Sequence, residues 1–535
     1  MLEAHEGFWG TFLKWRKETG EMWSFVKQRA LELDSPVFQL FMKGPFSKPW
    51  VVVTDFRENQ DIQSMRQGEF DRSTWLGDVF GPLLPGNHVW MQSNDQFRAN
   101  RNLLKDTMSP AFLNNVAAPG LHAATHDLVK LWREKIRLSQ GRPFQADVDI
   151  IRGVVDAIFL VSLGLELGLN IAQEALLSGL DNIAVSADLD SPVIFPSAQE
   201  HRAYTAVREL VNSIQIGMSS PWPKMTMNFV LKFFPSLVAA RRYTYHAVNG
   251  VLRGAWSRVS TVQSGEFQVE KAKCAADLMV LREAQQAKKQ NRPFQYDTPA
   301  IRDELLGFYL AGHETTSTTI CWAVKNLTEH QDVQQELRLA LRSAYPDAVK
   351  TNRLPTAREI VETSVPYLDA FIEENHRLGA AIPTMIRRAT RDATVLGHKI
   401  PKGTDVFMMV NGPSFQGPAL PVDESARSET SRATKDRYGT WNDDDVNRFV
   451  PKRFLVQDQG GHERFNPFAG PVLPYGAGLR GCFGIRLATL ELRVIITLIV
   501  WAFELQTTPP NLSSFQGNDV NTHRAKQTYL RLVEV

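Results

Sequence analysis

A single cysteine, Cys482, lies in a setting that suits a metal ligand. It sits in the glycine-rich run Pro474-Tyr475-Gly476-Ala477-Gly478-Leu479-Arg480-Gly481-Cys482-Phe483-Gly484, which leads into an apolar helix predicted for residues 485–504. A thiolate there would face the positive end of the helix dipole and the free N–H groups of the first turn. Gly478 and Gly484 allow tight turns and a close backbone approach to a flat partner. These features favour a metal-bound thiolate over a buried structural cysteine.

A second group combines a carboxylic acid with neighbouring alcohols. The run Ala311-Gly312-His313-Glu314-Thr315-Thr316 falls in the middle of a helix that we predict from Asp297 to about Lys325. Glycine and threonine are poor mid-helix residues, because hydroxyls compete for backbone carbonyls, so the pattern predicts a locally opened helix. Oxygen activation over a metal needs such room and a nearby proton source. Taken alone, the run fits a threonine-rich packing helix equally well.

A third group consists of charged residues. Glu374 and Arg377 stand at helical i, i+3 spacing, and Arg453 follows Pro451 further along the chain. Most pairs at this spacing are ordinary surface salt bridges. The spacing alone therefore does not separate a surface pair from a buried one.

Taken together, these segments resemble the cytochrome P-450 family. The cysteine loop follows that family's haem-binding pattern, with Tyr475 where the family usually has Phe, and with Ala488 completing the pattern. The acid–alcohol run is similar to its oxygen-binding helix, and the Glu374–Arg377 segment to its ExxR helix. The motifs occur in the family's order across roughly residues 97–491. The glycines from Gly476 to Gly481 also fit a dinucleotide fingerprint, but the flanking prolines make a poor central strand there.

The resemblance implies a role for each matched residue. Cys482 would be the axial ligand of haem b iron, and Glu314 and Thr315 would deliver protons during oxygen activation. Glu374, Arg377 and Arg453 would form a buried structural triad. The remaining implied residues contact the cofactor (Arg101, Arg387, Tyr475, Gly478, Arg480, Gly484) or line the substrate pocket (Ala311, Ile382, Met385). Phe97 stands where the family prefers Trp, which makes the match at Arg101 looser.

The elements that position these residues are predicted to be mainly α-helical with small β-sheets, in the cytochrome P-450 fold. Helical periodicity marks residues 154–169, 303–326 and 367–378, whereas residues 37–42 and 50–54 read as a β-hairpin and 405–410 as a strand. Since residues from the whole span would converge on one cofactor, we expect a single domain over residues 1–535. Within it, residues 1–35 form an N-terminal segment and 417–440 a solvated, partly disordered surface loop insertion.

Composition excludes several classes of protein. The formal net charge of +2 gives no argument for nucleic-acid binding. Three widely spaced cysteines exclude a disulfide framework and suit a reducing compartment. Seven charged or ionisable residues among the first twenty exclude a spanning helix or a signal peptide there (Glu3, His5, Glu6, Lys14, Arg16, Lys17, Glu18). The sequence leaves open a soluble cytoplasmic location or the surface of the endoplasmic reticulum.

One further segment, residues 219–238, interleaves aromatic residues with lysines. It fits a membrane-facing segment and fits equally well an apolar lid over the substrate pocket. Neither reading implies a membrane anchor in this sequence.

The implied activity is insertion of one oxygen atom from O2 into a small apolar organic substrate, in secondary metabolite biosynthesis of a eukaryotic, fungal type. Because no flavin or nicotinamide domain is evident, electrons would come from an NADPH-cytochrome reductase. The alternatives are a haem-thiolate isomerase or dehydratase that acts on an oxygenated lipid without O2 or reductase, and a haem-based sensor or carrier. Retention of Glu314 and Thr315 favours the monooxygenase. The substrate itself is not encoded in any pattern we recognise.

Overall fold

The computed structural model describes residues 2–3, 14–15, 18, 21–41, 48–260 and 272–535. The chain divides into two compact units, and each contains segments from distant parts of the sequence. The first, which we call the sheet unit, comprises Met1–Trp75, Asp369–Ile485 and Gly517–Arg524. The second, the helical unit, comprises Leu76–Leu368, Arg486–Gln516 and Ala525–Val535. Neither unit is one continuous stretch of sequence.

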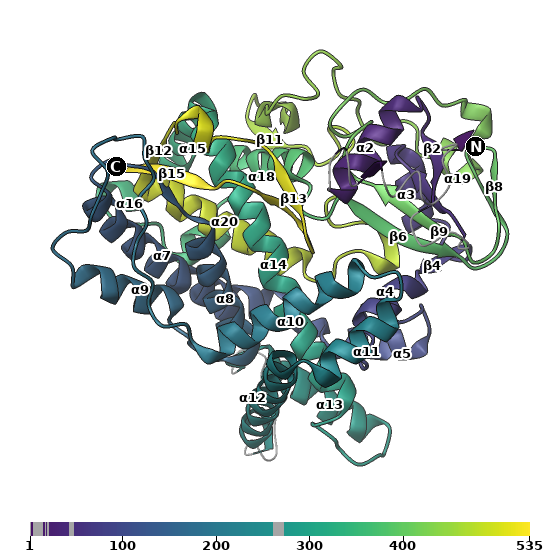
Figure 1. Cartoon of the computed structure of the whole chain (residues 1–535), viewed down its shortest axis with the longest axis horizontal. Helices are drawn as coiled ribbons and strands as arrows, with labels where there is room; N and C mark the ends of the chain where they lie inside the picture. The colour runs from purple at the N-terminus through teal and green to yellow at the C-terminus, as the bar shows by residue number, and fades with distance from the viewer. Residues whose placement is uncertain (1, 4–13, 16–17, 19–20, 42–47, 261–271) are drawn as a thin grey trace. The chain divides into compact units, whose positions relative to one another are not determined.

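The sheet unit is built on a six-stranded sheet with the order β1-β2-β3-β9-β6-β4 (Figure 1). Its strands are β1 (Leu2–Glu3), β2 (Val37–Leu40), β3 (Trp50–Val53), β4 (Phe70–Arg72), β6 (Thr384–Ala389) and β9 (Asp405–Met409). Smaller two-stranded sheets pair β7 (Ala393–Val395) with β8 (His398–Ile400), β10 (Leu455–Gln457) with β11 (Glu463–Phe465), and β13 (Gly517–Asp519) with β14 (His523–Ala525). The helices of this unit are α2 (Met22–Glu32), α3 (Phe56–Ser64), most of α18 (Pro366–Gly379) and α19 (Glu429–Ala433).

The central sheet confirms the two hairpin strands predicted at residues 37–42 and 50–54. Strand β2 pairs antiparallel with β3, with Val37 opposite Val53. The turn residues Gly44 and Pro45 lie outside the described residues. The strand predicted at 405–410 is β9, which follows a turn at Gly403 (φ +83°) and pairs with β6. All five of its residues are buried, and Val406 and Met408 lie in a core with Val51, Val53 and Ile62.

The segment 417–440 is more ordered than the predicted solvated loop. It contains a short helix η4 (Glu424–Ala426) and helix α19, and it binds α3 through buried charges. Both Nη atoms of Arg427 donate to the Asp55 carboxylate, at 2.6 and 2.9 Å, and the Ser428 hydroxyl donates to Asp61 at 2.6 Å. The polar and charged residues that suggested disorder instead form side-chain hydrogen bonds.

The helical unit consists mainly of helices. These are most of α4 (Thr74–Phe80), α5 (Asp95–Leu103), α6 (Pro110–Phe112), α7 (Ala118–Ser139), α8 (Asp147–Leu163), α9 (Leu169–Ser178), α10 (Arg202–Met218), α11 (Pro223–Phe233), α12 (Pro235–Ser260), α13 (Ala275–Lys289), α14 (Pro299–Glu329), α15 (Gln331–Ala344), α16 (Pro346–Lys350), α17 (Ala357–Glu362) and α20 (Ile485–Ala502). A small sheet joins β5 (Phe144–Gln145), β15 (Tyr529–Glu534) and β12 (Phe503–Gln506). The predicted mainly helical class is therefore confirmed.

The longest helix, α14, extends the predicted segment at its C-terminal end. Thr298 caps its first turn by accepting the Ile301 N–H, and Pro299 occupies the first helical position, where no donor is needed. The helix packs closely on α8: a Cβ added to Gly312 would lie 2.9 Å from Ile158. Glycine at this position therefore allows the two helices to approach each other.

Two helix boundaries differ from the predictions. The pattern at 154–169 is divided between α8 and α9, because Gly164 (φ +66°) ends α8 in the left-handed conformation. The cysteine helix α20 ends at Ala502, two residues earlier than predicted. Among the described residues, no helix is both long and apolar enough to cross a bilayer.

Candidate haem-thiolate site

The Cys482 loop has a defined backbone conformation in the sheet unit. The Cys482 N–H donates to the Tyr475 carbonyl at 2.8 Å, which closes the loop around the short helix η6 (Gly478–Arg480). The Cys482 side chain is exposed, unlike those of Cys274 and Cys321. The loop therefore presents its thiol at the surface of a fixed turn, three residues before α20 begins.

Helix α3 supports this loop from one side. The Ala477 N–H donates to Gln63 Oε1 at 3.0 Å. A Cβ added to Gly478 (φ +67°) would lie 2.3 Å from the Gln63 carbonyl oxygen, whereas one added to Gly484 would meet nothing within 4 Å. Gly478 is thus required by packing against α3. Gly484 leaves the backbone beside Cys482 open to a partner.

Two of the arginines expected to contact the cofactor lie together in the sheet unit. Arg387 on β6 and Arg480 in the loop are both buried, and Arg480 Nη2 lies 3.4 Å from Asp71 Oδ1. Burial and the neighbouring positive charge of Arg480 lower the pKa of Arg387 to about 10. Two buried guanidinium groups thus lie near each other and near Asp71, and their positive charge favours binding of an acidic group.

The three residues expected to form a structural triad are in direct contact. Arg377 holds Glu374 in a bidentate pair at 2.6 and 2.7 Å, and Arg453 Nε donates to Glu374 Oε1 at 3.1 Å. Arg377 also donates to the carbonyls of Phe415 and Val446. The side chains of Glu374 and Arg377 are fully buried. This network anchors α18 to the segments that precede the cysteine loop.

Sequence reasoning missed the partner of Tyr475. The Tyr475 hydroxyl lies 3.0 Å from Nε2 of His376, and the two rings meet edge to face with centroids 5.1 Å apart. Burial lowers the pKa of His376 to about 4, so that its ring is neutral at physiological pH. His376 directly precedes Arg377, but nothing in the sequence links it to a residue 99 positions away.

The acid–alcohol run lies on α14 in the helical unit. Glu314 is buried, and the Thr315 hydroxyl donates to the Ala311 carbonyl at 3.0 Å. Thr319 makes the same contact with the Thr315 carbonyl at 2.9 Å. The predicted local opening of the helix is wrong for this structure: α14 is helical from Pro299 to Glu329. The hydroxyls bond to carbonyls one turn earlier without breaking the helix.

A buried acid next to this run also escaped prediction. Glu491 on α20 is 1% exposed and forms a side-chain hydrogen bond with Thr316, while its Oε1 atom has no hydrogen-bond partner among the described residues. Burial raises the pKa of Glu491 to about 8. The residue stands nine positions after Cys482, in an apolar helix that gives no sequence signal for a partner on α14.

The remaining predicted residues fall in both units. Arg101 on α5, in the helical unit, lies over the ring of Phe97 with its guanidinium carbon 5.7 Å from the centroid. Ala311 is an exposed position of α14. In the sheet unit, Ile382 and Met385 are partly buried near the start of β6, and the Met385 sulfur lies 3.7 Å from where a Cβ on Gly476 would be. Met385 therefore borders the cysteine loop.

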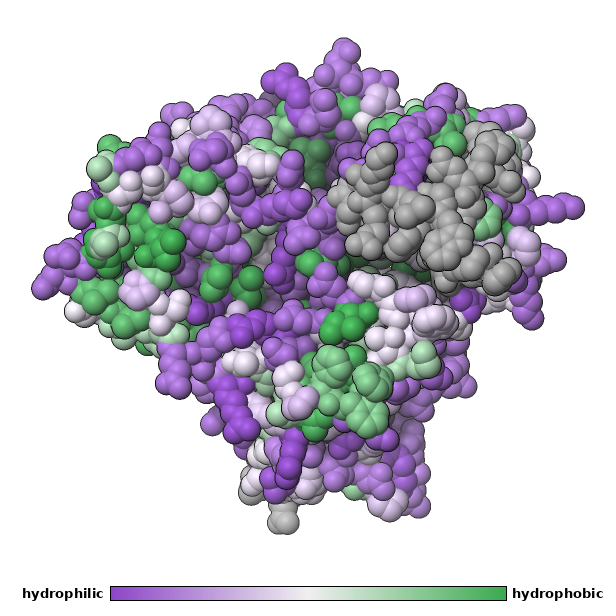
Figure 2. All heavy atoms as spheres, viewed as in Figure 1, coloured by the Kyte–Doolittle hydropathy of each residue, from purple (hydrophilic) through white to green (hydrophobic). Residues whose placement is uncertain are grey.

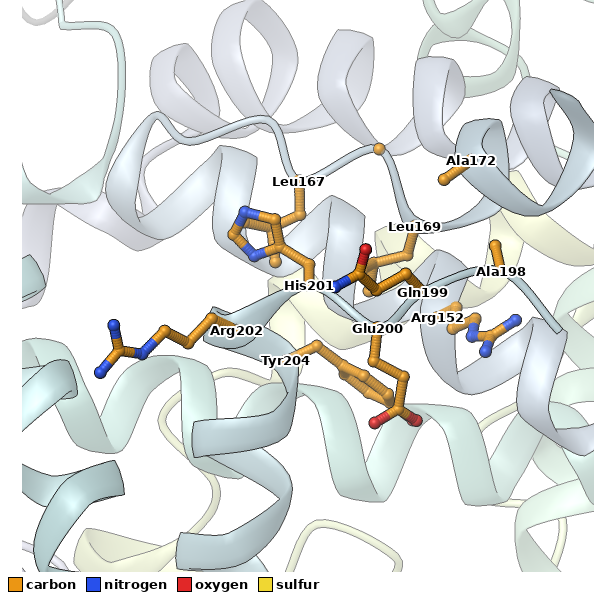
Figure 3. Close-up of a pocket in the computed structure, with 11 residues that line it drawn as sticks. Arg152, Leu167, Leu169, Ala172, Ala198, Gln199, Glu200, His201, Arg202 and Tyr204 are labelled. Atoms are coloured by element: carbon orange, nitrogen blue, oxygen red, sulfur yellow. The ribbon is translucent and has the colours of Figure 1, made fainter. Parts of the chain in front are cut away.

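A cavity of about 400 Å³ lies elsewhere in the helical unit (Figure 3). Arg152, Gly168, His201 and Tyr204 are among the residues that line it, and none of the predicted site residues does so. Figure 3 shows the carboxylate of Glu200 pointing away from the ring of His201. This carboxylate forms an ion pair with Arg208. The residues that line the cavity are thus different from those of the candidate site.

The residues of the sheet unit fit a haem group on chemical grounds. An exposed thiol on a rigid loop can ligate iron, and the open backbone at Gly484 tolerates a flat ligand. The buried guanidinium groups of Arg387 and Arg480 match the charge of carboxylate substituents such as propionates.

Comparison with known proteins establishes the family. The family model "Cytochrome P450" matches residues 7–413 and 441–527 and leaves out 414–440, where the ordered insertion lies. A cytochrome P450 monooxygenase of Pestalotiopsis microspora is 45% identical over 522 residues, which cover 97% of this chain and 90% of that protein. The cytochrome P450 monooxygenase TRI13 of Fusarium sporotrichioides is 34% identical over 531 residues, covering 96% and 90%.

A solved structure agrees in fold. The crystal structure of the cytochrome P450DA heme domain aligns with a TM-score of 0.68 at 17% identity, covering 96% of this chain and 93% of that one. The chain belongs to the cytochrome P450 family. It is an oxidoreductase of the monooxygenase class, and the predicted fold class is confirmed. The family and fold imply haem iron with a thiolate ligand, together with O2 and a redox partner.

Proposed function

We propose that the protein binds haem b through the Cys482 thiolate and inserts one oxygen atom from O2 into a small apolar organic substrate. The bound haem would supply O2 activation. Arg387 and Arg480 hold its propionates from the sheet unit, and Arg101 on α5 contributes a further cation. The observation that supports this most strongly is the placement of an exposed thiol and two buried arginines in one unit.

Glu314 and Thr315 carry the proton-transfer role in this proposal. Both lie on α14, and the Thr315 side chain is one helical turn from Ala311, to whose carbonyl it donates. A hydroxyl that can exchange this bond for one to a water molecule can hold that water near the reacting oxygen. Glu314, one residue earlier, carries protons to it. Ala311, Ile382 and Met385 supply apolar surface for the substrate.

Electrons come from a separate NADPH-cytochrome reductase, and the product belongs to secondary metabolism. The similarity to fungal monooxygenases supports the second point, including a relative named for the Hps1-dma1 cluster of Dothistroma septosporum, which is 38% identical over 282 residues (50% of this chain, 89% of that protein). The isomerase or dehydratase alternative would need neither O2 nor reductase. Product formation only in the presence of NADPH and reductase supports the monooxygenase; turnover without them supports the alternative.

Replacement of the proposed ligand tests the site directly. Cys482→Ser removes the thiolate and should eliminate the thiolate-type Soret band of the reduced, carbon-monoxide-bound protein. Cys274→Ser is the matched control, because that thiol is buried in the helical unit and burial raises the pKa of Cys274 to about 11. A thiolate-type band that survives in Cys482→Ser contradicts the assignment.

We also propose that α11 and the start of α12 contact a lipid surface. Six large apolar side chains are exposed there: Trp222, Met225, Phe229, Phe233, Phe234 and Val238. Trp222, Met225, Phe229 and Phe233 follow helical spacing, and Figure 2 shows an apolar patch over this region. The adjacent lysines Lys224 and Lys232 are exposed and suit anionic headgroups.

Flotation with vesicles that contain anionic lipid tests this contact. The wild type should float, and Phe233→Ser/Phe234→Ser should remain in the soluble fraction. Leu339→Ser on α15 is the control, because it removes an equally exposed apolar side chain from another surface of the helical unit. If wild type and the double variant both remain soluble, the segment is not a lipid contact, and the alternative of a lid over the pocket gains support.

A further inference from the structure

The cavity in Figure 3 lies within the helical unit, between α8, α9 and the chain that leads into α10. Its volume of about 400 Å³ falls in the range of small-molecule sites, roughly 300–1,000 Å³. The lining combines a buried cation, Arg152, with the apolar residues Leu167, Leu169, Ala172 and Ala198. A cavity of this size and mixed lining has room for an organic molecule that carries a charged group.

Arg152 on α8 is a nearly buried cation that forms no ion pair within the described part of the chain. It is 7% exposed, and its Nη1 atom donates to the neutral amide oxygen of Gln173 at 3.1 Å. Its Nε and Nη2 atoms have no acceptor among the described residues. A buried charge is costly unless an opposite charge or hydrogen bonds compensate it. Arg152 therefore has both the charge and the donors to bind an anion.

The carboxylates around Arg152 are engaged by other groups. Asp149, Asp156 and Glu200 all interact with Arg152 electrostatically. Asp149, however, accepts a hydrogen bond from the Lys135 ammonium group at 2.5 Å, and Asp156 accepts the N–H groups of the first turn of α9. Glu200 lines the cavity, but its carboxylate belongs to the ion pair described above. None of these acids accepts a hydrogen bond from Arg152.

The N-terminus of α10 offers further donors to the same cavity, which Arg202 and Tyr204 line. The backbone N–H groups of these two residues lack an acceptor among the residues that the structure describes. The Ala203 N–H between them donates to His201 Nδ1 at 3.1 Å, so a neutral His201 ring carries its proton on Nε2. The positive end of the helix dipole also favours an anion here.

The side chain of Arg202 does not contribute to this set. Figure 3 shows its guanidinium group extending away from the other labelled side chains. The donors that remain are the Arg152 guanidinium group, the two backbone N–H groups and the His201 ring. These groups suit the two oxygen atoms of a carboxylate.

We propose that this cavity binds a small organic carboxylate. Its acid group bonds to Arg152 and to the first turn of α10, and its apolar body lies against Leu167 and Leu169. The donors select an acid over a neutral molecule, and the apolar residues favour an organic acid over an inorganic anion. Because the ligand joins α8 to α10, its binding stabilises the helical unit. The proposal is independent of the haem site, since the candidate haem residues do not line this cavity.

Isothermal titration of the haem-loaded, full-length protein with benzoate measures this binding. Benzamide and inorganic phosphate are the comparison ligands: the first keeps the apolar ring and lacks the charge, and the second keeps the charge and lacks the ring. Benzoate should bind saturably and raise the melting temperature. Benzamide and phosphate should each bind at least about tenfold more weakly. Lack of saturable benzoate binding, or an affinity for benzamide or phosphate equal to that for benzoate, would overturn the proposal.

Two matched variants locate the binding. Ala172→Glu places a carboxylate at the cavity without removing a buried group, because Ala172 is exposed and lines it. Ala175→Glu makes the same change at an exposed position of α9 that does not line the cavity. The first variant should weaken benzoate binding at least about tenfold, and the second should leave it unchanged. Wild-type affinity in Ala172→Glu would mean that benzoate binds elsewhere and would refute the assignment.

Arg152→Gln tests the central donor. It should weaken benzoate binding by at least about tenfold, because a hydrogen bond to a charged group is lost. Arg152→Lys keeps the charge and should retain part of the affinity. Wild-type affinity in Arg152→Gln would contradict the role of Arg152. Should Arg152→Gln fail to fold, the comparison of Ala172→Glu with Ala175→Glu still decides the outcome.

Discussion

Glu491 makes the stability of the helical unit depend on pH in a direction opposite to that of a paired carboxylate. Burial raises its pKa to about 8, against an ordinary value of 4.5. Between these values the folded chain retains a proton that the unfolded chain has released. Stability is therefore lost as the pH rises from about 5 to 8. Replacement by glutamine removes the titration and keeps a hydrogen-bonding group for Thr316.

The size of the effect follows from the shift. One pKa unit corresponds to about 1.4 kcal/mol. Between pH 5 and pH 8 the free energy of unfolding of the wild type should therefore fall by roughly 3–4 kcal/mol relative to that of Glu491→Gln. Urea unfolding at several pH values measures the difference. The control is Glu362→Gln on α17, whose carboxylate is exposed and pairs with Arg358. A difference between Glu491→Gln and wild type that stays constant from pH 5 to pH 8 would refute this reasoning.

Three further substitutions test other parts of the site. Thr315→Ala should reduce the coupling of NADPH consumption to product formation by a factor on the order of 10² or more, with peroxide released instead and haem content unchanged. Intact coupling with modest destabilisation would mean that the hydroxyl serves only to bond the Ala311 carbonyl. Glu374→Gln should lower the free energy of unfolding, measured with urea, by about 3–5 kcal/mol, because Arg377 and Arg453 lose their shared buried carboxylate. A loss below about 1 kcal/mol would show that the triad is not structural. Arg387→Gln should lower the haem content per polypeptide without lowering the stability of the haem-free protein. Arg388→Gln breaks an ion pair with Asp405 and should instead lower the stability while leaving the haem content unchanged. Equal haem content in Arg387→Gln and wild type would remove Arg387 from the cofactor site.

Fixed spacings explain which features could be predicted from the sequence. The Cys482 loop, helix α14 and the Glu374–Arg377 pair are local patterns, and the structure forms them where the sequence indicated. His376 and Glu491 were missed because their partners, Tyr475 and Thr316, lie far away in the sequence. A titratable residue in a helix reveals neither its burial nor its partner until tertiary packing is known.

Composition misled about disorder in the segment 417–440, although many of its residues are exposed as expected. Its serines, threonines and charges are typical of solvated loops, but Arg427 is 8% exposed and Ser428 caps α19. Polar side chains can satisfy a helix cap or a buried ion pair as well as they bind water. The run around Thr315 on α14 gave a similar error. Threonine content suggested disruption, but hydroxyl groups that bond to carbonyls one turn earlier are compatible with a continuous helix.

The ordered insertion also restricts how this chain could be shortened. The family model passes over 414–440, so removal of that stretch would restore the length that the model matches. Removal would, however, leave the Asp55 carboxylate, which is 6% exposed and caps α3, without Arg427, and Asp61 without Ser428. Since α3 supports the cysteine loop through Gln63, a trimmed chain would be weakened at the helix that borders its proposed ligand. The packing around α3 thus depends on the insertion, and a viable deletion would require a compensating change at Asp55.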